Sequence, residues 1–388
     1  MERLSTSNLK LGIIAGGQLG KMLIQEASKW DIVSFVLDDD EDCPAGSLAN
    51  HFVKGSRFDF DSVYEFGKLV DVLTFEIESI NIEALQKLKS EGVKIIPDPD
   101  ILGLIQDKGL QKEFYSKNDI PTARYILSDS DNDIKKALGN GEISFPFVQK
   151  LRKGGYDGRG VAVIDNEAGL DSLLEGPSII EEKISISKEI AVIVARNAHG
   201  DVQSFPVVEM IFDPRANLVD NLICPAAITP GLSEKATKIA AQAVTQLDMV
   251  GLLAVELFID DQDRIYLNEI APRPHNSGHH TIESMITSQY EQHLRAILDL
   301  PLGSTKLKMP AVMVNILGEE GYSGPVLYEG LKDIMAIEGV KIHLYGKKIT
   351  RPYRKMGHVT IISDTLEESI NKAEAVQNLI KVKSWKKS

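Results

Sequence analysis

Cysteines and long apolar runs are scarce in this chain of 388 residues. The two cysteines, Cys43 and Cys224, lie far apart and match no metal-binding or redox spacing. This usage excludes a disulfide-rich secreted fold and is typical of a reducing compartment. The N-terminal ten residues lack the apolar core of a signal peptide, and no apolar run reaches the roughly 18 residues of a membrane span. We therefore expect a cytosolic protein without a membrane partner.

Positive charge is also in short supply. The formal net charge of −13 argues against general binding to nucleic acids or to anionic membranes. An anionic substrate must therefore be held by local groups of positive charge. The composition, with 43% hydrophobic and 26% charged residues, is that of a globular protein. A chain of this length predicts two or three domains.

Residues 9–97 alternate between short apolar strands and helices, which predicts a doubly wound parallel sheet. The first strand ends in the turn Ala15-x-Gly17-x-x-Gly20, which lacks the first glycine of a dinucleotide-binding motif, although Asp38 lies near the position of a ribose-binding acid. Such a turn offers backbone N–H groups to any phosphate. The N-terminal fold alone therefore leaves an NAD-dependent oxidoreductase as an alternative.

Two X-Pro steps at residues 97–100 mark a boundary, and residues 121–184 have the pattern of a small α+β unit. After a strand at 147–150, residues 154–160 contain four glycines together with Tyr156, Asp157 and Arg159. A loop of this kind can approach phosphates closely, and Arg159 can neutralise their charge. The alternative is a flexible hairpin tip.

Residues 254–259 and 264–270 predict a β-hairpin around the polar turn 260–263. A symmetric turn would pair Glu256 with Leu267 and place Glu269 one step diagonally along the same face. Diagonal neighbours have Cα atoms roughly 7–8 Å apart, close enough for two carboxylates to hold a divalent cation. The alternative is that one acid points to solvent. The polar residues that follow, 275–280, belong to a loop at a strand end, where functional groups concentrate.

The C-terminal part predicts further strands and helices. We expect strands at 178–184, 189–195, 202–208, 311–317, 341–344 and 358–362, with helices at 233–247 and 365–382. Arg351, Arg354 and Lys355 precede the last of these strands. Three cations so close together in an acidic protein indicate an anion site.

Four segments together carry a resemblance to a known family: GGQLGKM (16–22), GGYDGRG (154–160), NEIAPRPHNSGHH (268–280) and RPYRKMGH (351–358). The chain resembles the ATP-grasp superfamily and, within it, the N5-carboxyaminoimidazole ribonucleotide synthetases. The resemblance implies an α/β and α+β architecture, the ATP-grasp fold. It would comprise an N-terminal doubly wound domain (1–97), a small central lid domain (98–185) and a C-terminal mixed-sheet domain (186–388) with the magnesium and bicarbonate sites.

The implied reaction is the ATP-dependent carboxylation of 5-aminoimidazole ribonucleotide with bicarbonate, through carboxyphosphate and carbon dioxide. The implied partners are ATP, bicarbonate and this nucleotide, with Mg²⁺ as cofactor and a homodimer as the assembly. The formate-dependent glycinamide ribonucleotide transformylase, which shares a Pro-Arg-Pro-His segment, is the nearest alternative. A non-catalytic binding protein on the same scaffold is another.

The resemblance also implies roles for individual residues. The ATP site would comprise Lys108, Lys150, Gly155, Tyr156, Asp157, Gly158, Arg159, Gly160, Glu181, Glu182, Lys183, Ile184, Glu189, Asn268 and Glu269. Magnesium would be held by Glu256 and Glu269. Bicarbonate and carbon dioxide would be held by Arg273, His275, Asn276 and Lys355, and Asp157 would take a proton from the substrate amine. The nucleotide substrate would contact Gln18, Leu19, Glu76, Tyr156, Arg159, Arg351 and Lys355. The sequence departs from the common family pattern at Ala15, Lys21 and Lys108.

Overall fold

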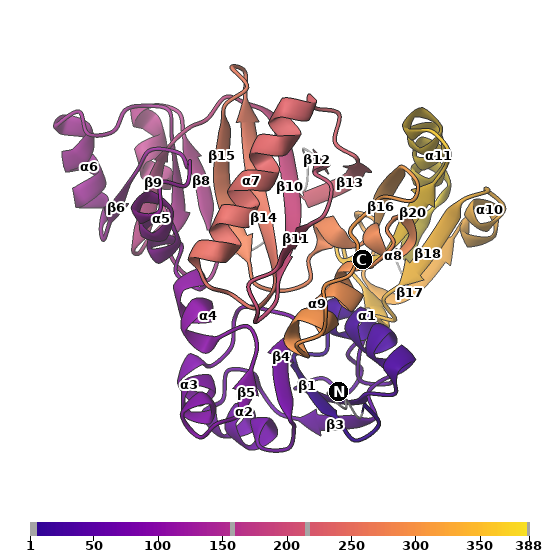
Figure 1. Ribbon diagram of the computed structural model, residues 1–388. Helices are drawn as coiled ribbons and strands as arrows, with labels where there is room; N and C mark the ends of the chain where they lie inside the picture. The colour runs from indigo at the N-terminus through magenta and orange to yellow at the C-terminus, as the bar shows by residue number, and fades with distance from the viewer. Residues whose placement is uncertain (1–5, 156–159, 214–217, 386–388) are drawn as a thin grey trace.

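The computed structural model describes residues 6–155, 160–213 and 218–385. These residues form sheets of five, four, nine and three strands, with helices packed against them (Figure 1). Within the described ranges, no helix combines the length and apolarity that crossing a membrane requires.

The N-terminal sheet is parallel throughout, with strand order β3-β2-β1-β4-β5. Its strands are β1 (Lys10–Ile14), β2 (Val33–Asp38), β3 (His51–Lys54), β4 (Val72–Phe75) and β5 (Lys94–Ile95). Its helices are α1 (Gln18–Ala27), α2 (Phe60–Gly67) and α3 (Ile82–Ser90), with a 3-10 turn at Ser28–Trp30. The doubly wound fold is confirmed. Ala15, in the turn before α1, has a φ of 72°, a left-handed conformation that glycine adopts more readily.

A four-stranded antiparallel sheet follows, with strand order β6-β9-β7-β8. Its strands are β6 (Tyr125–Ser128), β7 (Phe147–Leu151), β8 (Val161–Ile164) and β9 (Ser178–Glu182). Helices α4 (Pro99–Ile105) and α5 (Lys108–Lys117) lead into it, and α6 (Asp131–Gly139) and the 3-10 turn Glu167–Ser172 belong to the same unit. The predicted α+β unit is therefore present.

The nine-stranded sheet is the largest in the described chain. Its strands are β10 (Ile186–Arg196), β11 (Val202–Ser204), β12 (Val208–Asp213), β13 (Leu218–Cys224), β14 (Gly251–Asp260), β15 (Ile265–Ala271), β16 (Ala311–Leu317), β18 (Val340–Leu344) and β20 (Lys355–Ile362). Helix α7 (Pro230–Gln246) packs its apolar face on β10, β14 and β15. Helix α11 (Leu366–Leu379) packs on β16 and β20.

Shorter elements complete the described chain. They are the 3-10 turn Asn276–Gly278, α8 (Thr281–Ser284), α9 (Gln289–Ile297), α10 (Leu331–Met335) and the sheet of β17 (Gly324–Glu329), β19 (Ile349–Thr350) and β21 (Lys381–Ser384). Side chains of α9 and α1 share one apolar core that includes Met22, Leu23, Leu294 and Ile297. The first and last thirds of the chain therefore lie against each other, as α1 and α9 do in Figure 1.

Two sequence predictions of the secondary structure were wrong. The single strand expected at 202–208 is two strands, because Pro206 has no N–H to continue a ladder. The helix expected at 365–382 ends at Leu379, and residues 381–384 form β21. That strand pairs with β17, a partner about 55 residues away that a local periodicity does not reveal. The division into domains at 97 and 185 stays a prediction.

Candidate active site

The hairpin β14–β15 places two carboxylates opposite each other. Glu256 pairs directly with Glu269, and the register shifts between Glu256 and Leu257. The predicted pairing of Glu256 with Leu267 was wrong, since Leu257 is the residue opposite Leu267. Part of the difference between the predicted and the observed register arises at the turn, where Ile259 pairs with Ile265. The rest arises at the β-bulge between Glu256 and Leu257.

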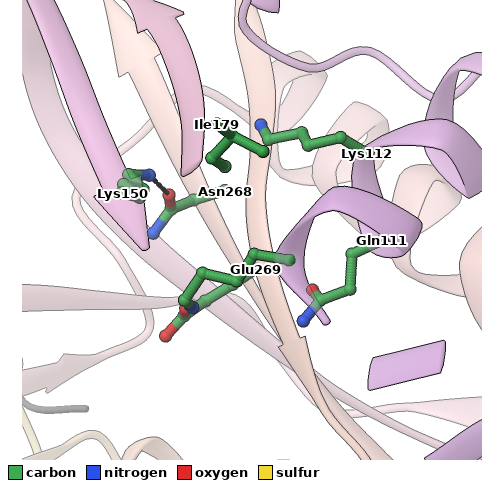
Figure 2. A pocket seen from close by; sticks show the side chains of 7 residues that line it. Gln111, Lys112, Lys150, Ile179, Asn268 and Glu269 are labelled. Carbon is green, nitrogen blue, oxygen red and sulfur yellow. Dashed lines mark hydrogen bonds and ion pairs between the residues drawn. The ribbon is translucent and has the colours of Figure 1, made fainter. Parts of the chain in front are cut away.

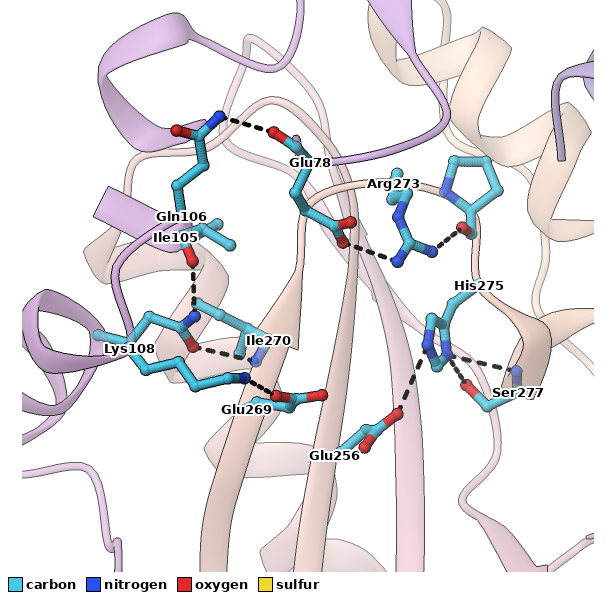
Figure 3. A network of polar contacts seen from close by, with 12 residues as sticks. Glu78, Ile105, Gln106, Lys108, Glu256, Glu269, Ile270, Arg273, His275 and Ser277 are labelled. Carbon is cyan, nitrogen blue, oxygen red and sulfur yellow. Dashed lines mark hydrogen bonds and ion pairs between the residues drawn. The ribbon is translucent and has the colours of Figure 1, made fainter. Parts of the chain in front are cut away.

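The two acids have opposite electrostatic surroundings (Figure 3). The Lys108 ammonium forms an ion pair with Glu269 and holds the pKa of Glu269 well below its ordinary value. Burial raises the pKa of Glu256, and the negative charges of Glu269 and Glu189 raise it further. Burial also raises the pKa of Glu189 to about 7. Lys108 neutralises Glu269, but Glu256 remains next to the negative charges of Glu269 and Glu189. A bound cation would relieve the repulsion among these carboxylates.

Next to this pair is a pocket that carries three lysines (Figure 2). Its lining residues are Lys108, Gln111, Lys112, Lys150, Ile179, Asn268 and Glu269. The side chain of Asn268, the residue between Leu267 and Glu269, accepts a 2.8 Å hydrogen bond from Lys150 Nζ. The pocket thus combines groups from α5, β7, β9 and β15, and its positive charge suits phosphates.

Glu181 forms ion pairs with two of the lysines that line the pocket. Glu181 is 4% exposed, and its carboxylate pairs with Lys112 Nζ at 2.5 Å and with Lys150 Nζ at 2.7 Å. Burial raises the pKa of Glu181, but the two lysines outweigh burial and leave it below its ordinary value. Sequence reasoning did not assign Lys112 to the site. Its spacing of four residues from Lys108 on one helix, which puts both on the same face, was the available signal.

The loop after β15 brings His275 to the carboxylate pair. His275 Nε2 lies 3.5 Å from Glu256 Oε1, and the Ser277 N–H donates to His275 Nδ1 at 3.3 Å. Burial, together with the charges of Arg273 and Lys355, lowers the pKa of His275 to about 3. The ring is therefore neutral near pH 7. His275 Nδ1 also lies 2.8 Å from Ser277 Oγ, so Ser277 holds the ring with Nε2 facing Glu256.

Arg273 and Asn276, in the same loop, form contacts with distant parts of the chain. Arg273 Nη2 pairs with Glu78 Oε1 at 2.7 Å, which joins the loop to the segment that follows β4 (Figure 3). The side-chain amides of Asn276 and Asn315 exchange hydrogen bonds of 3.0 and 3.1 Å. Glu78 and Asn315 were not assigned to the site from the sequence. An asparagine within the apolar run 311–317 was the signal for the latter.

The N-terminus of α1, where Gln18 and Leu19 begin the helix, holds a carboxylate. Glu76 accepts hydrogen bonds from the N–H groups of Gly17 and Gly20, the latter at 2.6 Å. Burial nevertheless raises the pKa of Glu76 to about 7. The N–H groups of Gly17 and Gly20 thus hold a carboxylate of the chain itself, and the contact of the Gln18–Leu19 turn with a phosphate stays a prediction.

A cluster of cations lies near Glu76. Lys347 Nζ donates to the Lys355 carbonyl oxygen at 2.8 Å. Burial and the charge of Arg354 lower the pKa of Lys347 to about 8, and Lys355 and Arg351 add to this lowering while Glu76 opposes it. Sequence reasoning missed Lys347, because it stands outside the segment 351–358 that was singled out.

The remaining predicted residues belong to the glycine loop and to the end of β9. Gly155 and Gly160 are described, whereas Tyr156, Asp157, Gly158 and Arg159 lie outside the described residues. Glu182 ends β9, and Lys183 and Ile184 follow it. Lys183 pairs with Asp165 at 2.9 Å on the surface, and the roles of these residues in nucleotide binding stay predictions.

Three domain families match the chain in sequence. Residues 9–106 match the ribonucleotide synthetase preATP-grasp domain, residues 113–290 the ATP-grasp domain, and residues 311–372 the phosphoribosylaminoimidazole carboxylase C-terminal domain. The N5-carboxyaminoimidazole ribonucleotide synthase of Bacillus subtilis is 36% identical over 364 residues, which cover 93% of each chain. The chloroplastic phosphoribosylaminoimidazole carboxylase of Vigna aconitifolia is 40% identical over 92% of this chain, but this chain spans only 64% of that protein.

Solved structures are similar over nearly the whole chain. N5-carboxyaminoimidazole ribonucleotide synthetase from Thermotoga maritima has a TM-score of 0.89 and 47% identity, and the match covers 97% of this chain and 99% of that one. The synthase from Aspergillus clavatus, solved with ADP and 5-aminoimidazole ribonucleotide, has a TM-score of 0.87 and 32% identity over 96% of this chain and 99% of that one.

Proposed function

The chain belongs to the N5-carboxyaminoimidazole ribonucleotide synthetase family of ATP-grasp ligases, and from this premise we propose that it carboxylates 5-aminoimidazole ribonucleotide. ATP and bicarbonate are the co-substrates, and the products are N5-carboxyaminoimidazole ribonucleotide, ADP and phosphate. The observation that carries the proposal is the position of the Glu256–Glu269 pair, between the lysine pocket and His275. The relatives do not favour the formate-dependent transformylase.

The carboxylate pair suits magnesium. In the part of the chain that the structure describes, no group of three or more His, Cys, Asp or Glu side chains is arranged to hold a metal. Magnesium commonly binds to one or two carboxylates and takes its other ligands from substrate phosphates and water. Glu256 and Glu269 fit this pattern, since burial and the charges of Glu269 and Glu189 raise the pKa of Glu256 and a cation would relieve the repulsion. Bound Mg²⁺ would neutralise charge on the ATP phosphates during phosphoryl transfer.

The other assigned residues bind and orient the reactants. Lys108 and Lys150 contact phosphates of ATP. Arg273, His275, Asn276 and Lys355 hold bicarbonate, whose oxygen attacks the γ-phosphorus as ADP departs, and they retain the carbon dioxide released from carboxyphosphate. Glu189 binds the ribose of ATP. Exclusion of water from the site would protect carboxyphosphate from hydrolysis.

The nucleotide substrate occupies the N-terminal side of the site. Its phosphate meets the Gln18–Leu19 turn together with Arg351, Lys355 and Lys347, since cations and helix N–H groups both favour a phosphate. Its amine attacks carbon dioxide to form the new C–N bond, and Asp157 accepts the proton that the nitrogen loses.

The experiment is ADP release with ATP, Mg²⁺ and bicarbonate, with and without 5-aminoimidazole ribonucleotide. We expect strong stimulation by the nucleotide and incorporation of labelled bicarbonate carbon. Stimulation by glycinamide ribonucleotide and formate instead would overturn the acceptor assignment.

The variants His275→Ala and Lys355→Ala should lower the rate while ATP binding persists, and loss of ATP binding would contradict the bicarbonate assignment. The homodimer and the cytosolic location remain predictions, which light scattering and cell fractionation test.

A further inference from the structure

The main chain of His275 is held by the side chain of a residue 14 positions further on. The His275 N–H donates to Gln289 Oε1 at 2.9 Å, and Gln289 Nε2 donates to the His275 carbonyl oxygen at 2.8 Å. Gln289 Nε2 also lies 3.3 Å from His279 Nδ1. Gln289 is fully buried, and both the oxygen and the nitrogen of its carboxamide have partners in the loop that carries His275.

The loop fits closely around this carboxamide. A side chain at Gly278 would collide with Gln289 Oε1, so the glycine permits the approach. Gln289 is the first residue of α9, and the Gln289 N–H donates to Thr281 Oγ1 at 2.8 Å. Helix α9 in turn packs against α1 through the core they share. The position of the His275 peptide is therefore fixed relative to α9, the helix that also packs against α1.

We propose that Gln289 is a positioning residue for His275: its carboxamide fixes the His275 peptide so that Nε2 faces Glu256. This inference rests on the proposed function, in which His275 holds bicarbonate. Nε2 is the ring atom that faces Glu256, so a rotation of the peptide would move it away from the carboxylate pair. Displacement of a reacting group by about 1 Å can cost about 100-fold in rate.

The same helix offers a matched control. Gln292, three residues on and also fully buried, holds Gly303 in the same way: Gln292 Nε2 donates to the Gly303 carbonyl oxygen at 2.9 Å and the Gly303 N–H donates to Gln292 Oε1 at 2.7 Å. Its loop carries none of the assigned site residues. The two carboxamides therefore form the same pair of backbone hydrogen bonds, Gln289 with His275 and Gln292 with Gly303.

The test compares Gln289→Glu with Gln292→Glu. Glutamate keeps the shape and the acceptor but loses the N–H donors. We expect Gln289→Glu to lower kcat/KM for bicarbonate by about 10- to 100-fold, with KM for ATP within about 2-fold of wild type. Gln292→Glu should leave both constants within about 2-fold while lowering the melting temperature to a similar extent. If either glutamate variant does not fold, Gln289→Met and Gln292→Met replace the pair.

Equal losses in the two variants, an equal effect on KM for ATP, or wild-type kinetics in Gln289→Glu would each overturn the proposal. Wild-type enzyme without bicarbonate-dependent turnover would instead overturn the proposed function. The positioning role is then read from ¹⁵N-histidine spectra, with the His275 signals assigned by their absence in His275→Asn. We expect the same His275 tautomer balance in wild type and Gln292→Glu, and an altered balance in Gln289→Glu. Identical His275 signals in all three proteins would overturn it.

Discussion

At the scale of single residues, Glu269 takes part in two competing interactions. It pairs with Lys108 in the structure, and under the proposed function it binds magnesium. We predict that Glu269→Gln lowers ADP release by about 100-fold or more, because charge neutralisation by a metal ion contributes several kcal/mol. The measurement is turnover against Mg²⁺ concentration. Glu283→Gln, which alters an acid paired with His343 at 3.1 Å, is the control. Near-wild-type turnover with normal magnesium dependence would remove Glu269 from its role.

Glu256 should make stability depend on pH. Its pKa rises from 4.5 to about 8 in the folded protein, because of burial and the charges of Glu269 and Glu189. The folded state thus holds the proton more tightly than the unfolded chain does. The resulting stabilisation is fully present below pH 4.5 and is lost as the pH rises through about 8.

We therefore predict that the melting temperature of Glu256→Gln, minus that of wild type, increases between pH 4.5 and about 8. His275, whose pKa is lowered to about 3, acts below pH 6.5 in both proteins and largely cancels in the difference. Thermal melts across this range provide the measurement. Saturating Mg²⁺ and ATP should reduce the difference, and a difference that does not vary with pH would contradict the prediction.

At the scale of elements, the pocket depends on α5, β7 and β9 meeting at Glu181. Lys112, which is 2% exposed, supports this junction from α5. We predict that Lys112→Met lowers the free energy of unfolding by about 3 kcal/mol, since removing one partner leaves a buried charge undercompensated. ATP affinity should fall less than in Lys150→Met, which removes a phosphate contact. Urea unfolding and nucleotide titration measure the two effects, and the reverse order of ATP affinities would contradict the assignment.

At the scale of the whole molecule, the α1–α9 core joins the N-terminal sheet to the rest of the chain. Leu294 is fully buried in that core. We predict that Leu294→Ala lowers the free energy of unfolding by about 2–5 kcal/mol. Because the core is shared, calorimetry should still show one transition at a lower temperature. Two transitions, of which only one moves, would show that the parts unfold independently.

The sequence by itself determined the local elements and the family. Strand and helix alternation in residues 9–97, the hairpin around 260–263 and the motifs at 154–160 and 268–280 follow from short-range patterns, because backbone preferences and periodicity act within a few residues. Eleven of the 24 assigned site residues lie in the two motifs at 154–160 and 268–280. Among the described ones, Glu256 and Glu269 pair across the hairpin, and Lys108, Lys150 and Asn268 line the lysine pocket; their roles stay predictions.

Only the tertiary structure decided how these pieces meet. The bulge that sets Glu256 opposite Glu269, the pairing of Lys112 with Glu181, the burial of Lys347 and the contacts of Gln289 with His275 all join residues that no local pattern relates. Their physical origin is packing. A single extra residue in one strand changes which side chains are opposite, and a buried polar group takes whichever partner the fold brings within hydrogen-bond distance.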